Sequence, residues 1–372
     1  MANKIRMACT AAALVPLALL AACGSSGGSS TTAATPSSSP AASASATGVS
    51  LTETGSTLMF PLFGAWQTAY NTTVTTVTIT TAGTGSGTGI ADAGTGTVTI
   101  GASDAYLSPA IMSQYPGLEN IPLTVAALMV NYNLPGVKTP LKLNGTVLAQ
   151  IYTGKIKTWN DPEIAALNPG VTLPSTAITV IHRSDSSGTT SGFTSFLAAV
   201  DPEFKSKVGE GKDVQWPTGT GAKGNAGVAG AVQQTTGAVG YVEQAYALQH
   251  NFTYASVKNS SGSFIAPTLA STSAAGEGVT VPANLGIKVI NSPTASAYPI
   301  ASQTFLVVNK DLCKAGQSES IAKGVVKFID YGLNQGQSIL GQADYAGLPA
   351  SILAKSKEAA AGLQCNGTAL GG

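Results

Sequence analysis

The chain has 372 residues, of which 44% are hydrophobic and only 10% are charged. This length exceeds one typical hydrophobic core, so we expect two domains. The formal net charge is +1, and no basic stripe is interleaved with aromatic residues. This charge pattern argues against a nucleic-acid partner.

The N-terminal segment, residues 1–22, has the pattern of an export signal. Lys4 and Arg6 precede a short apolar run, Ala11 to Ala22, that is too short to span a bilayer as a stable helix. The run ends in L-A-A-C, which resembles the lipobox of bacterial lipoproteins. This resemblance implies cleavage before Cys23 and attachment of lipid to its thiol. An ordinary signal peptide with an accidental cysteine is the alternative.

Residues 23–48 are predicted to form a flexible tether. From Gly24 to Gly48 the sequence is almost entirely Gly, Ser, Thr, Ala and Pro, which cannot bury a core. No later segment offers the ~20 apolar residues of a membrane-spanning helix. We therefore expect a globular body outside the cytoplasm, anchored to the cell membrane by lipid on Cys23.

The body alternates predicted strands and helices, which is typical of an α/β architecture with mostly parallel sheets. Strands are expected at Thr76–Thr80, Val98–Ala102, Pro122–Asn133, Ile178–His182, Thr236–Val242 and Gln303–Val308. Helices are expected at Val147–Tyr152, Pro162–Leu167, Thr190–Val200, Ile321–Tyr331 and Ser351–Ala361.

Two cysteines remain in the body after Cys23 and the signal are set aside. In an exported protein, the pair Cys313 and Cys365 predicts one disulfide, and two independent thiols are the alternative. A metal site is disfavoured, because there is no second cysteine pair and both histidines lie far away in sequence.

Three turns rich in Gly, Ser and Thr each lead into a predicted helix: Thr54–Pro61, Gly83–Gly89 and Arg183–Thr190. A helix start has unpaired backbone N–H groups and a partial positive charge, so it attracts anions. Each turn alone is better explained as a helix cap or a tight turn. Three of them in one chain predict an anion site.

Two charged residues follow predicted strands directly. Asp104 follows V-T-I-G-A-S, and Arg183 follows I-T-V-I-H. Open α/β sheets place their ligands at the carboxyl ends of strands. The alternatives are a helix cap for Asp104, and a surface charge or an interdomain salt bridge for Arg183.

These motifs together resemble the PstS-type phosphate-binding proteins of phosphate-specific ABC transporters. The resemblance runs from about Leu51 to Tyr246, and the segment from about Asn251 to Pro299 departs most from the family. The motifs that carry it are TGSTLMFPLFGAW, TGTGSGTGI, IGASDAYLS, NYNLPGV, LNGTVLAQIYTGKIKTWNDPEIAALNPG, HRSDSSGTTSGFTSFL and TGAVGYVEQAYA.

The resemblance implies a type II periplasmic-binding-protein fold, in which two α/β lobes joined by a two-crossing hinge close on dehydrated phosphate. Lobe I would comprise residues 49–129 plus 301–372, and lobe II residues 130–300. The implied protein is a receptor and not an enzyme, with no cofactor. Its partners are inorganic phosphate and the permease and ATPase subunits of an importer.

The resemblance also implies roles for individual residues. Arg183 is expected to pair with both phosphate and Asp104. The first turn reads GSTLM where other members have GAGAT, so its hydroxyl and amide donors stay open. The residues expected to contact phosphate are Ser56, Thr57, Leu58, Ser86, Asp104, Arg183, Ser187, Gly188 and Thr189.

Asp104 is expected to set the selectivity of the site. Hydrogen phosphate carries at least one O–H donor, whereas sulfate at neutral pH carries none. A fixed carboxylate accepts that hydrogen but repels bare sulfate oxygens, and a buried mismatch of this kind costs ~3 kcal/mol or more. The expected discrimination is at least about a hundredfold.

Three rival functions stay open at this point. A receptor for sulfate or molybdate is one, although Asp104 argues against it. A secreted phosphate-ester hydrolase would need a metal cluster or an activated nucleophile that no motif supplies. An interaction lipoprotein would bind no phosphate.

One further motif, Gly219–Gly224, matches G-x-G-x-x-G. It follows Gln215-Trp216-Pro217 and not an apolar strand, so a dinucleotide site is disfavoured.

Overall fold

The computed structural model describes residues 48–371. The predicted signal at residues 1–22, the lipidation site Cys23 and all of the predicted tether except Gly48 lie outside the described residues. None of the described helices is long and apolar enough to cross a membrane.

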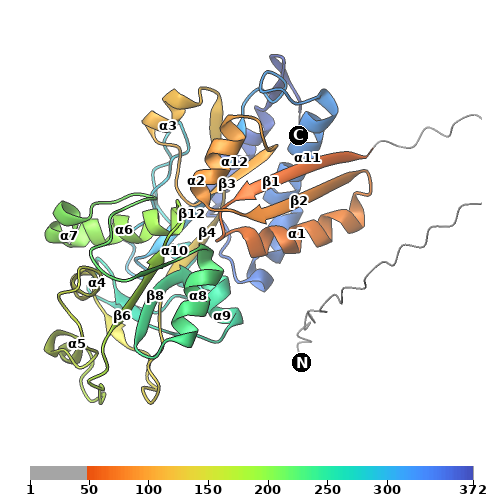
Figure 1. Ribbon diagram of the computed structural model, residues 1–372. Coiled ribbons are helices and arrows are strands. Elements are labelled where there is room, and N and C mark those ends of the chain that lie inside the picture. Colours follow the sequence, from red (N-terminus) through yellow and green to blue (C-terminus); the bar gives the residue numbers. More distant parts are fainter. Residues whose placement is uncertain (1–47, 372) are drawn as a thin grey trace, which may run out of the picture. The chain divides into compact units, whose positions relative to one another are not determined.

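The described residues form a mixed α/β fold around a nine-stranded sheet with the order β2-β1-β3-β12-β4-β8-β6-β7, in which β9 also pairs with β4 (Figure 1). Strands β1, β2, β3 and β12 belong to one lobe, which we call the first lobe. Strands β6, β7 and β8 belong to the other, the second lobe. The strand bounds are β1 (Val49–Gly55), β2 (Val77–Gly83), β3 (Ile100–Ser103), β4 (Leu118–Tyr132), β6 (Thr179–Arg183), β7 (Thr220–Ala222), β8 (Ala238–Glu243), β9 (Thr253–Tyr254) and β12 (Ala301–Asn309).

The long strand β4 links the two lobes. Its residues Leu118 to Ala127 pair antiparallel with β12, and Leu128 to Tyr132 pair antiparallel with β8. Every residue of β4 except Glu119 is buried, as its nearly continuous apolar sequence predicts. The chain therefore passes from one lobe to the other along β4 and returns at β12. The predicted lobe boundaries at 129/130 and 300/301 stay a prediction.

The prediction of mostly parallel sheets is correct only for the outer strands. β1 is parallel to β2 and β3, and β6 is parallel to β7 and β8. The central strands β12, β4 and β8 pair antiparallel, because a chain that leaves one lobe along β4 must return beside it.

Helices cover the sheet in both lobes. In the first lobe they are α1 (Phe60–Thr73), α2 (Ser86–Gly94), α3 (Pro109–Gln114), α11 (Glu319–Leu333), the 3-10 helix η1 (Gln335–Ala343) and α12 (Ala350–Ala361). Between β4 and β12 the chain forms α4 (Gly145–Tyr152), α5 (Pro162–Leu167), α6 (Gly188–Val200), α7 (Pro202–Lys207), α8 (Gly224–Gln234), α9 (Gln244–Gln249) and α10 (Leu269–Ala274). Small strands complete the fold: β5 (Lys142–Leu143), β10 (Ser256–Lys258), β11 (Phe264–Ile265), β13 (Gln364–Cys365) and β14 (Thr368–Ala369).

An aromatic cluster fixes α1 and α11 in the first lobe. Phe63 and Trp66 of α1 are fully buried and contact Phe328 of α11 with ring centroids 6.3 and 6.4 Å apart. The indole N–H of Trp66 donates to the Gly336 carbonyl at 3.1 Å. This packing holds the start of α1, which follows the first Gly/Ser/Thr turn.

A second aromatic cluster lies behind the third turn. The Phe193 and Tyr241 rings stack with centroids 4.4 Å apart, and Tyr152 packs against Phe193 at 4.8 Å. The Tyr241 hydroxyl accepts from the Arg183 amide at 3.1 Å and hydrogen-bonds to Thr190 at 2.7 Å. The core of the second lobe therefore positions both the end of β6 and the start of α6.

A disulfide joins Cys313 to Cys365. It ties the segment after β12 to the C-terminal hairpin of β13 and β14.

Candidate functional site

The first turn follows β1 and lies against the end of β3. Gly55 has a φ of +138°, and a Cβ there would lie 2.1 Å from the Ala102 carbonyl oxygen, so only glycine fits. The Ser56 amide donates to the same carbonyl at 2.9 Å. The turn is thereby held against the strand that leads to Asp104.

The Ser56 hydroxyl already has partners within the protein. Its oxygen accepts the amide hydrogens of Leu58 and Met59 at 3.1 and 3.2 Å, and its hydrogen is donated to Asp104 Oδ1. A serine hydroxyl has one donor and two acceptor positions, so all three are used. Ser56 therefore shapes the turn and orients Asp104.

The second turn begins α2 at Ser86, which is 1% exposed. The Ser86 hydroxyl oxygen accepts the Asp104 amide hydrogen at 3.2 Å, and the same hydroxyl lies beside the Asp104 carboxyl, whose pKa it lowers. The next residue, Gly87, donates its amide to the Ser186 carbonyl at 3.0 Å. This backbone bond connects the first lobe to the third turn, in the second lobe.

The third turn begins α6. The Ser187 hydroxyl caps the helix by accepting the Thr190 amide at 3.1 Å, and the Ser187 amide donates to the Lys212 carbonyl. The amides of Gly188 and Thr189 precede the first intrahelical bond of α6, so they are available donors at a positive helix end.

Gly188 lies at a close approach between the two lobes. A Cβ at this position would lie 2.5 Å from Ser86 Oγ and 2.7 Å from Asp104 Cβ. The start of α6 therefore meets the start of α2 and Asp104, and the structure brings the predicted turns together.

Asp104 is buried between the lobes, with 6% of its surface exposed. Oδ1 accepts from Ser56 and Oδ2 accepts the Thr189 hydroxyl hydrogen at 3.3 Å. Burial raises the pKa of Asp104 to about 6, although the hydroxyls of Ser56, Thr189 and Ser86 and the positive charge of Arg183 oppose the rise. Asp104 thus has hydroxyl neighbours and no direct cationic partner.

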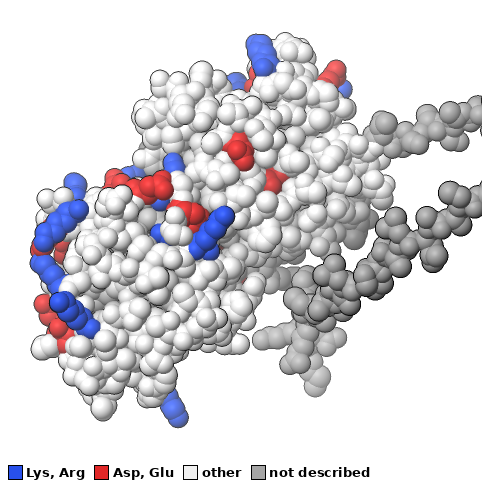
Figure 2. Space-filling model, in the orientation of Figure 1, with Lys and Arg blue, Asp and Glu red and all other residues white. Residues whose placement is uncertain are grey.

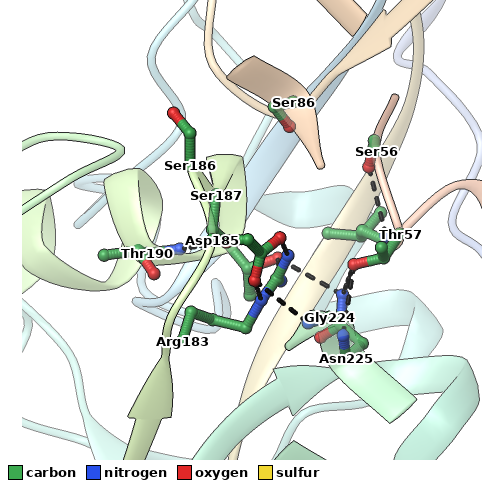
Figure 3. Close-up of polar contacts among 12 residues, drawn as sticks. Ser56, Thr57, Ser86, Arg183, Asp185, Ser186, Ser187, Thr190, Gly224 and Asn225 are labelled. Carbon is green, nitrogen blue, oxygen red and sulfur yellow. Dashed lines mark hydrogen bonds and ion pairs between the residues drawn. The ribbon is translucent and has the colours of Figure 1, made fainter. Parts of the chain in front are cut away.

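Arg183 pairs with Asp185 and not with Asp104, which differs from the expectation. Its Nε and Nη2 donate to the two carboxylate oxygens of Asp185 at 2.8 and 2.5 Å (Figure 3). Its Nη1 donates to the Thr189 hydroxyl at 3.2 Å. Arg183 pairs with Asp185 because Asp185 lies two residues further along the same turn, and its two carboxylate oxygens match the planar guanidinium. Thr189 lies between Arg183 and Asp104.

Asp185 has the opposite electrostatic behaviour to Asp104. Burial acts to raise its pKa, but hydrogen bonds from Arg183, the Arg183 charge and the Gly224 amide outweigh burial and lower it. The Arg183–Asp185 pair is therefore charged on both sides and internally balanced.

A fourth helix start, which the sequence interpretation missed, joins the site. The dismissed G-x-G-x-x-G segment forms β7 and the first residue of α8, and the Gly224 amide donates to Asp185 at 3.0 Å. The next residue, Asn225, is fully buried and donates to the Thr57 hydroxyl (Figure 3). The available signal was a glycine-rich turn before a small-residue run, the same signal as in the other three turns.

The two histidines lie in different parts of the second lobe. His182 lies in β6 and stacks on Trp216 with ring centroids 5.2 Å apart, and His250 follows α9. Within residues 48–371 no group of three or more His, Cys, Asp or Glu side chains could hold a metal ion.

Charged side chains are sparse on the face shown in Figure 2. They gather near α7 in the second lobe, with both signs mixed, while the surface over α1 and β2 is almost free of charge. Among the ion pairs near α7 are Lys155–Glu203 and Lys207–Glu203. This face has no extended patch of a single sign.

The chain is similar to known proteins over most of its length. Residues 39–334 match the model of the PBP superfamily domain. The chain is 37% identical to a phosphate-binding protein PstS of Haemophilus influenzae over 83% of this chain and 91% of that protein. It is also 37% identical to a PstS of Pasteurella multocida over 82% and 88%.

A solved structure supports the fold. The phosphate-binding protein from Stenotrophomonas maltophilia superposes with a TM-score of 0.67 at 19% identity, covering 86% of this chain and 99% of that one. The strand order, the β4 crossing and these matches agree on a periplasmic-binding-protein fold. The chain belongs to the PstS family of phosphate-binding proteins within the PBP superfamily.

Proposed function

We propose that the protein is an extracytoplasmic solute-binding lipoprotein that captures inorganic phosphate and delivers it to an ABC importer. The observation that carries this proposal is the placement of Asp104. It is a buried carboxylate among hydroxyl groups, at the meeting point of helix starts from both lobes. Such a site offers donors for anionic oxygens together with one fixed acceptor.

The donors for phosphate come from all three predicted turns. In the first lobe, the Thr57 hydroxyl has a hydrogen to give, and the Ser86 hydroxyl lies beside the Asp104 carboxyl. In the second lobe, the amides of Gly188 and Thr189 lie at the positive end of α6. Arg183 adds a cation whose charge is shared with Asp185. Helix starts and one balanced cation stabilise a dianion without a large positive surface.

The predicted contact residues divide into two groups: those whose donors are already used within the turns, and those whose groups remain available to the anion. Ser56, Ser187 and the Leu58 amide are engaged within their turns, so we assign them to shaping the site. The direct contacts are then assigned to the remaining predicted residues: Thr57, Ser86, Asp104, Arg183, Gly188 and Thr189.

Asp104 favours phosphate over the rival oxyanions. Its lone pairs accept a P–O–H hydrogen, whereas sulfate and molybdate at neutral pH bring only oxygens with no hydrogen to give. Leaving these charges facing one another in a buried site costs about 3 kcal/mol or more. The hydrolase alternative lacks support, because His182 stacks on Trp216 and His250 follows α9, and neither is among the side chains that hydrogen-bond to Asp104.

The remaining parts of the proposal concern the membrane. Cys23 carries lipid, residues 23–48 form the tether, and residues 49–129 with 301–372 close against residues 130–300 around the hinge. The closed protein presents phosphate to permease and ATPase subunits. Mass spectrometry of the protein from membranes should find acyl chains on Cys23. Recovery of a Cys23→Ala variant in the membrane fraction at the wild-type level would contradict the anchor.

Calorimetric titration of residues 49–372 tests the central function. We expect saturable binding of phosphate and, at pH 8, at least a hundredfold weaker binding of sulfate and molybdate. No heat with phosphate, or equal affinities, would overturn the proposal. Turnover of a chromogenic phosphate ester, with or without zinc, would favour the hydrolase instead.

A further inference from the structure

Asn225 makes contacts that neither the sequence motifs nor the comparisons assign. It is the second residue of α8 and is fully buried. Its side-chain amide Nδ2 lies 3.0 Å from Thr57 Oγ1, and its backbone N lies 3.2 Å from the same oxygen. Thr57 belongs to the first lobe and Asn225 to the second, so both hydrogen bonds cross between the lobes.

These two bonds determine what the Thr57 hydroxyl can do. A hydroxyl oxygen has two acceptor positions and one hydrogen to donate. Asn225 fills both acceptor positions, because its Nδ2 and its backbone N each donate to Oγ1. Thr57 then acts as a donor only. Among the described residues no acceptor takes its hydrogen, although the side chain is only 8% exposed.

The same side chain reaches a second hydroxyl of the site. Asn225 Nδ2 also lies 3.4 Å from Thr189 Oγ1, which accepts from Arg183 at 3.2 Å and donates to Asp104 at 3.3 Å. Asn225 therefore supports one hydroxyl from each lobe. A hydroxyl that accepts hydrogen bonds is polarised and becomes a better donor.

We propose that Asn225 is a positioning residue for phosphate capture. When the lobes close, it occupies both acceptor positions of the Thr57 hydroxyl and directs that hydroxyl's hydrogen to the anion. Because both bonds join residues of different lobes, opening of the lobes would break them, so Thr57 becomes an oriented donor as the lobes close. This inference rests on the proposed function and adds to it the residue that couples closure to binding.

Asn225 also has a structural contact that the experiment must separate. Its Oδ1 accepts the Glu243 amide hydrogen at 2.9 Å, at the end of β8. An Asn225→Ala variant leaves that buried amide unpaired and so lowers the stability of the free protein. A loss of stability alone does not support the proposal.

A double-mutant cycle with Thr57→Val isolates the positioning role. Phosphate association and dissociation rates are measured by stopped flow for the wild type, Asn225→Ala, Thr57→Val and the double variant. We expect Asn225→Ala to raise the dissociation rate about fivefold with little change in association, because it removes the Nδ2 bond to the Thr57 hydroxyl and keeps the backbone bond. In the Thr57→Val background the same substitution should raise dissociation less than it does in the wild type, because only the longer contact with Thr189 remains to be lost.

Two further variants complete the design. Asn133→Ala removes an amide that donates to the Gln233 carbonyl at 2.8 Å in the same lobe, and it should leave both rates unchanged. Thr57→Ser keeps the hydroxyl and should retain most of the affinity that Thr57→Val loses. If Asn225→Ala does not fold, Asn225→Ser takes its place in the cycle.

The outcomes separate the inference from the function. Equal increases in dissociation with and without the Thr57 hydroxyl would overturn the positioning role while leaving phosphate binding intact, and so would a wild-type rate in Asn225→Ala. A wild-type protein that binds no phosphate would overturn the proposed function itself.

Discussion

Asp104 and Asp185 lie in one site but on different lobes, and the protein treats them in opposite ways. Asp185 receives two hydrogen bonds from Arg183, which lower its pKa despite burial. The Asp104 carboxylate receives hydrogen bonds only from hydroxyls, and the Arg183 charge acts on it without direct contact. Burial therefore outweighs these effects and raises the pKa of Asp104 to about 6. The comparison indicates that a carboxylate paired with a cation has a structural role. A carboxylate bonded only to hydroxyls can still accept a hydrogen bond from a ligand.

The largest effect in this comparison should come from Asp104→Asn. We expect weaker phosphate binding and a loss of about a hundredfold in the preference for phosphate over sulfate, because the amide can donate to bare oxygens. Competition calorimetry at pH 8 measures the ratio. A ratio equal to that of the wild type would show that Asp104 does not determine the preference for phosphate over sulfate.

The pH dependence of stability should also separate the two aspartates. The folded-state pKa of Asp104 is raised, so the folded protein holds that proton more tightly than the unfolded chain. Its stabilising contribution is complete at low pH and is lost as the pH rises through about 6. The rise from 3.8 corresponds to about 3 kcal/mol. Asp185 has the opposite sign, because a lowered pKa gives stability that is lost as the pH falls.

Urea unfolding of the phosphate-free protein between pH 4.5 and 8 tests this sign. The buried Glu53 and Glu243 also have raised pKa values, both from burial, so the difference between wild type and Asp104→Asn isolates Asp104. The variant should gain relative stability with increasing pH. Parallel profiles would contradict a raised pKa for Asp104.

A substitution at the contact between the lobes should have a smaller effect on phosphate binding than Asp104→Asn. The Cβ in Gly188→Ala would collide with Ser86 and Asp104 from the opposite lobe. Overpacking of this kind costs about 1–3 kcal/mol, so we expect phosphate affinity to fall roughly tenfold or more. Gly230→Ala is the matched control, because a Cβ there meets nothing within 4 Å. Equal affinities in the two variants would mean that binding does not need this approach.

The smallest change is expected for Asp185→Asn. Loss of the pair frees more of the Arg183 charge for the anion and loosens the guanidinium, and these effects oppose each other. We expect the phosphate affinity to change less than about fivefold and the sulfate preference to persist. The same competition titration measures this preference. A loss of the preference as large as that expected for Asp104→Asn would show that both aspartates determine selectivity.

Much of the fold follows from local sequence. The apolar runs predict β4, β6, β8 and β12, and the predicted helix at Pro162–Leu167 agrees with α5 at both ends. Strand β1 was missed, because its sequence V-S-L-T-E-T-G is polar and even its Glu53 is buried in the sheet. The antiparallel pairing of β12 and β4 was missed too, since it depends on a return of the chain across more than a hundred residues.

Site residues could be predicted from the sequence where a single turn has a recognisable motif. They could not be predicted where a residue's role depends on contact between two distant segments. Gly/Ser/Thr turns and a strand-end aspartate identified the segments around Asp104 and Gly188. The Asp185 partner of Arg183 was missed because family resemblance assigned the arginine elsewhere. Asn225 was missed because its importance arises from contact with Thr57, 168 positions away in the sequence.

A neutron or atomic-resolution structure of the protein with phosphate would show directly whether Asp104 accepts a hydrogen from the anion. We expect a hydrogen on a phosphate oxygen, donated to an ionised Asp104 over about 2.5–2.7 Å, the length of a charge-assisted O–H···O⁻ bond. An Asp104 carboxylate that points away from the anion, or that reaches it only through a cation, would show that Asp104 does not accept the phosphate hydrogen.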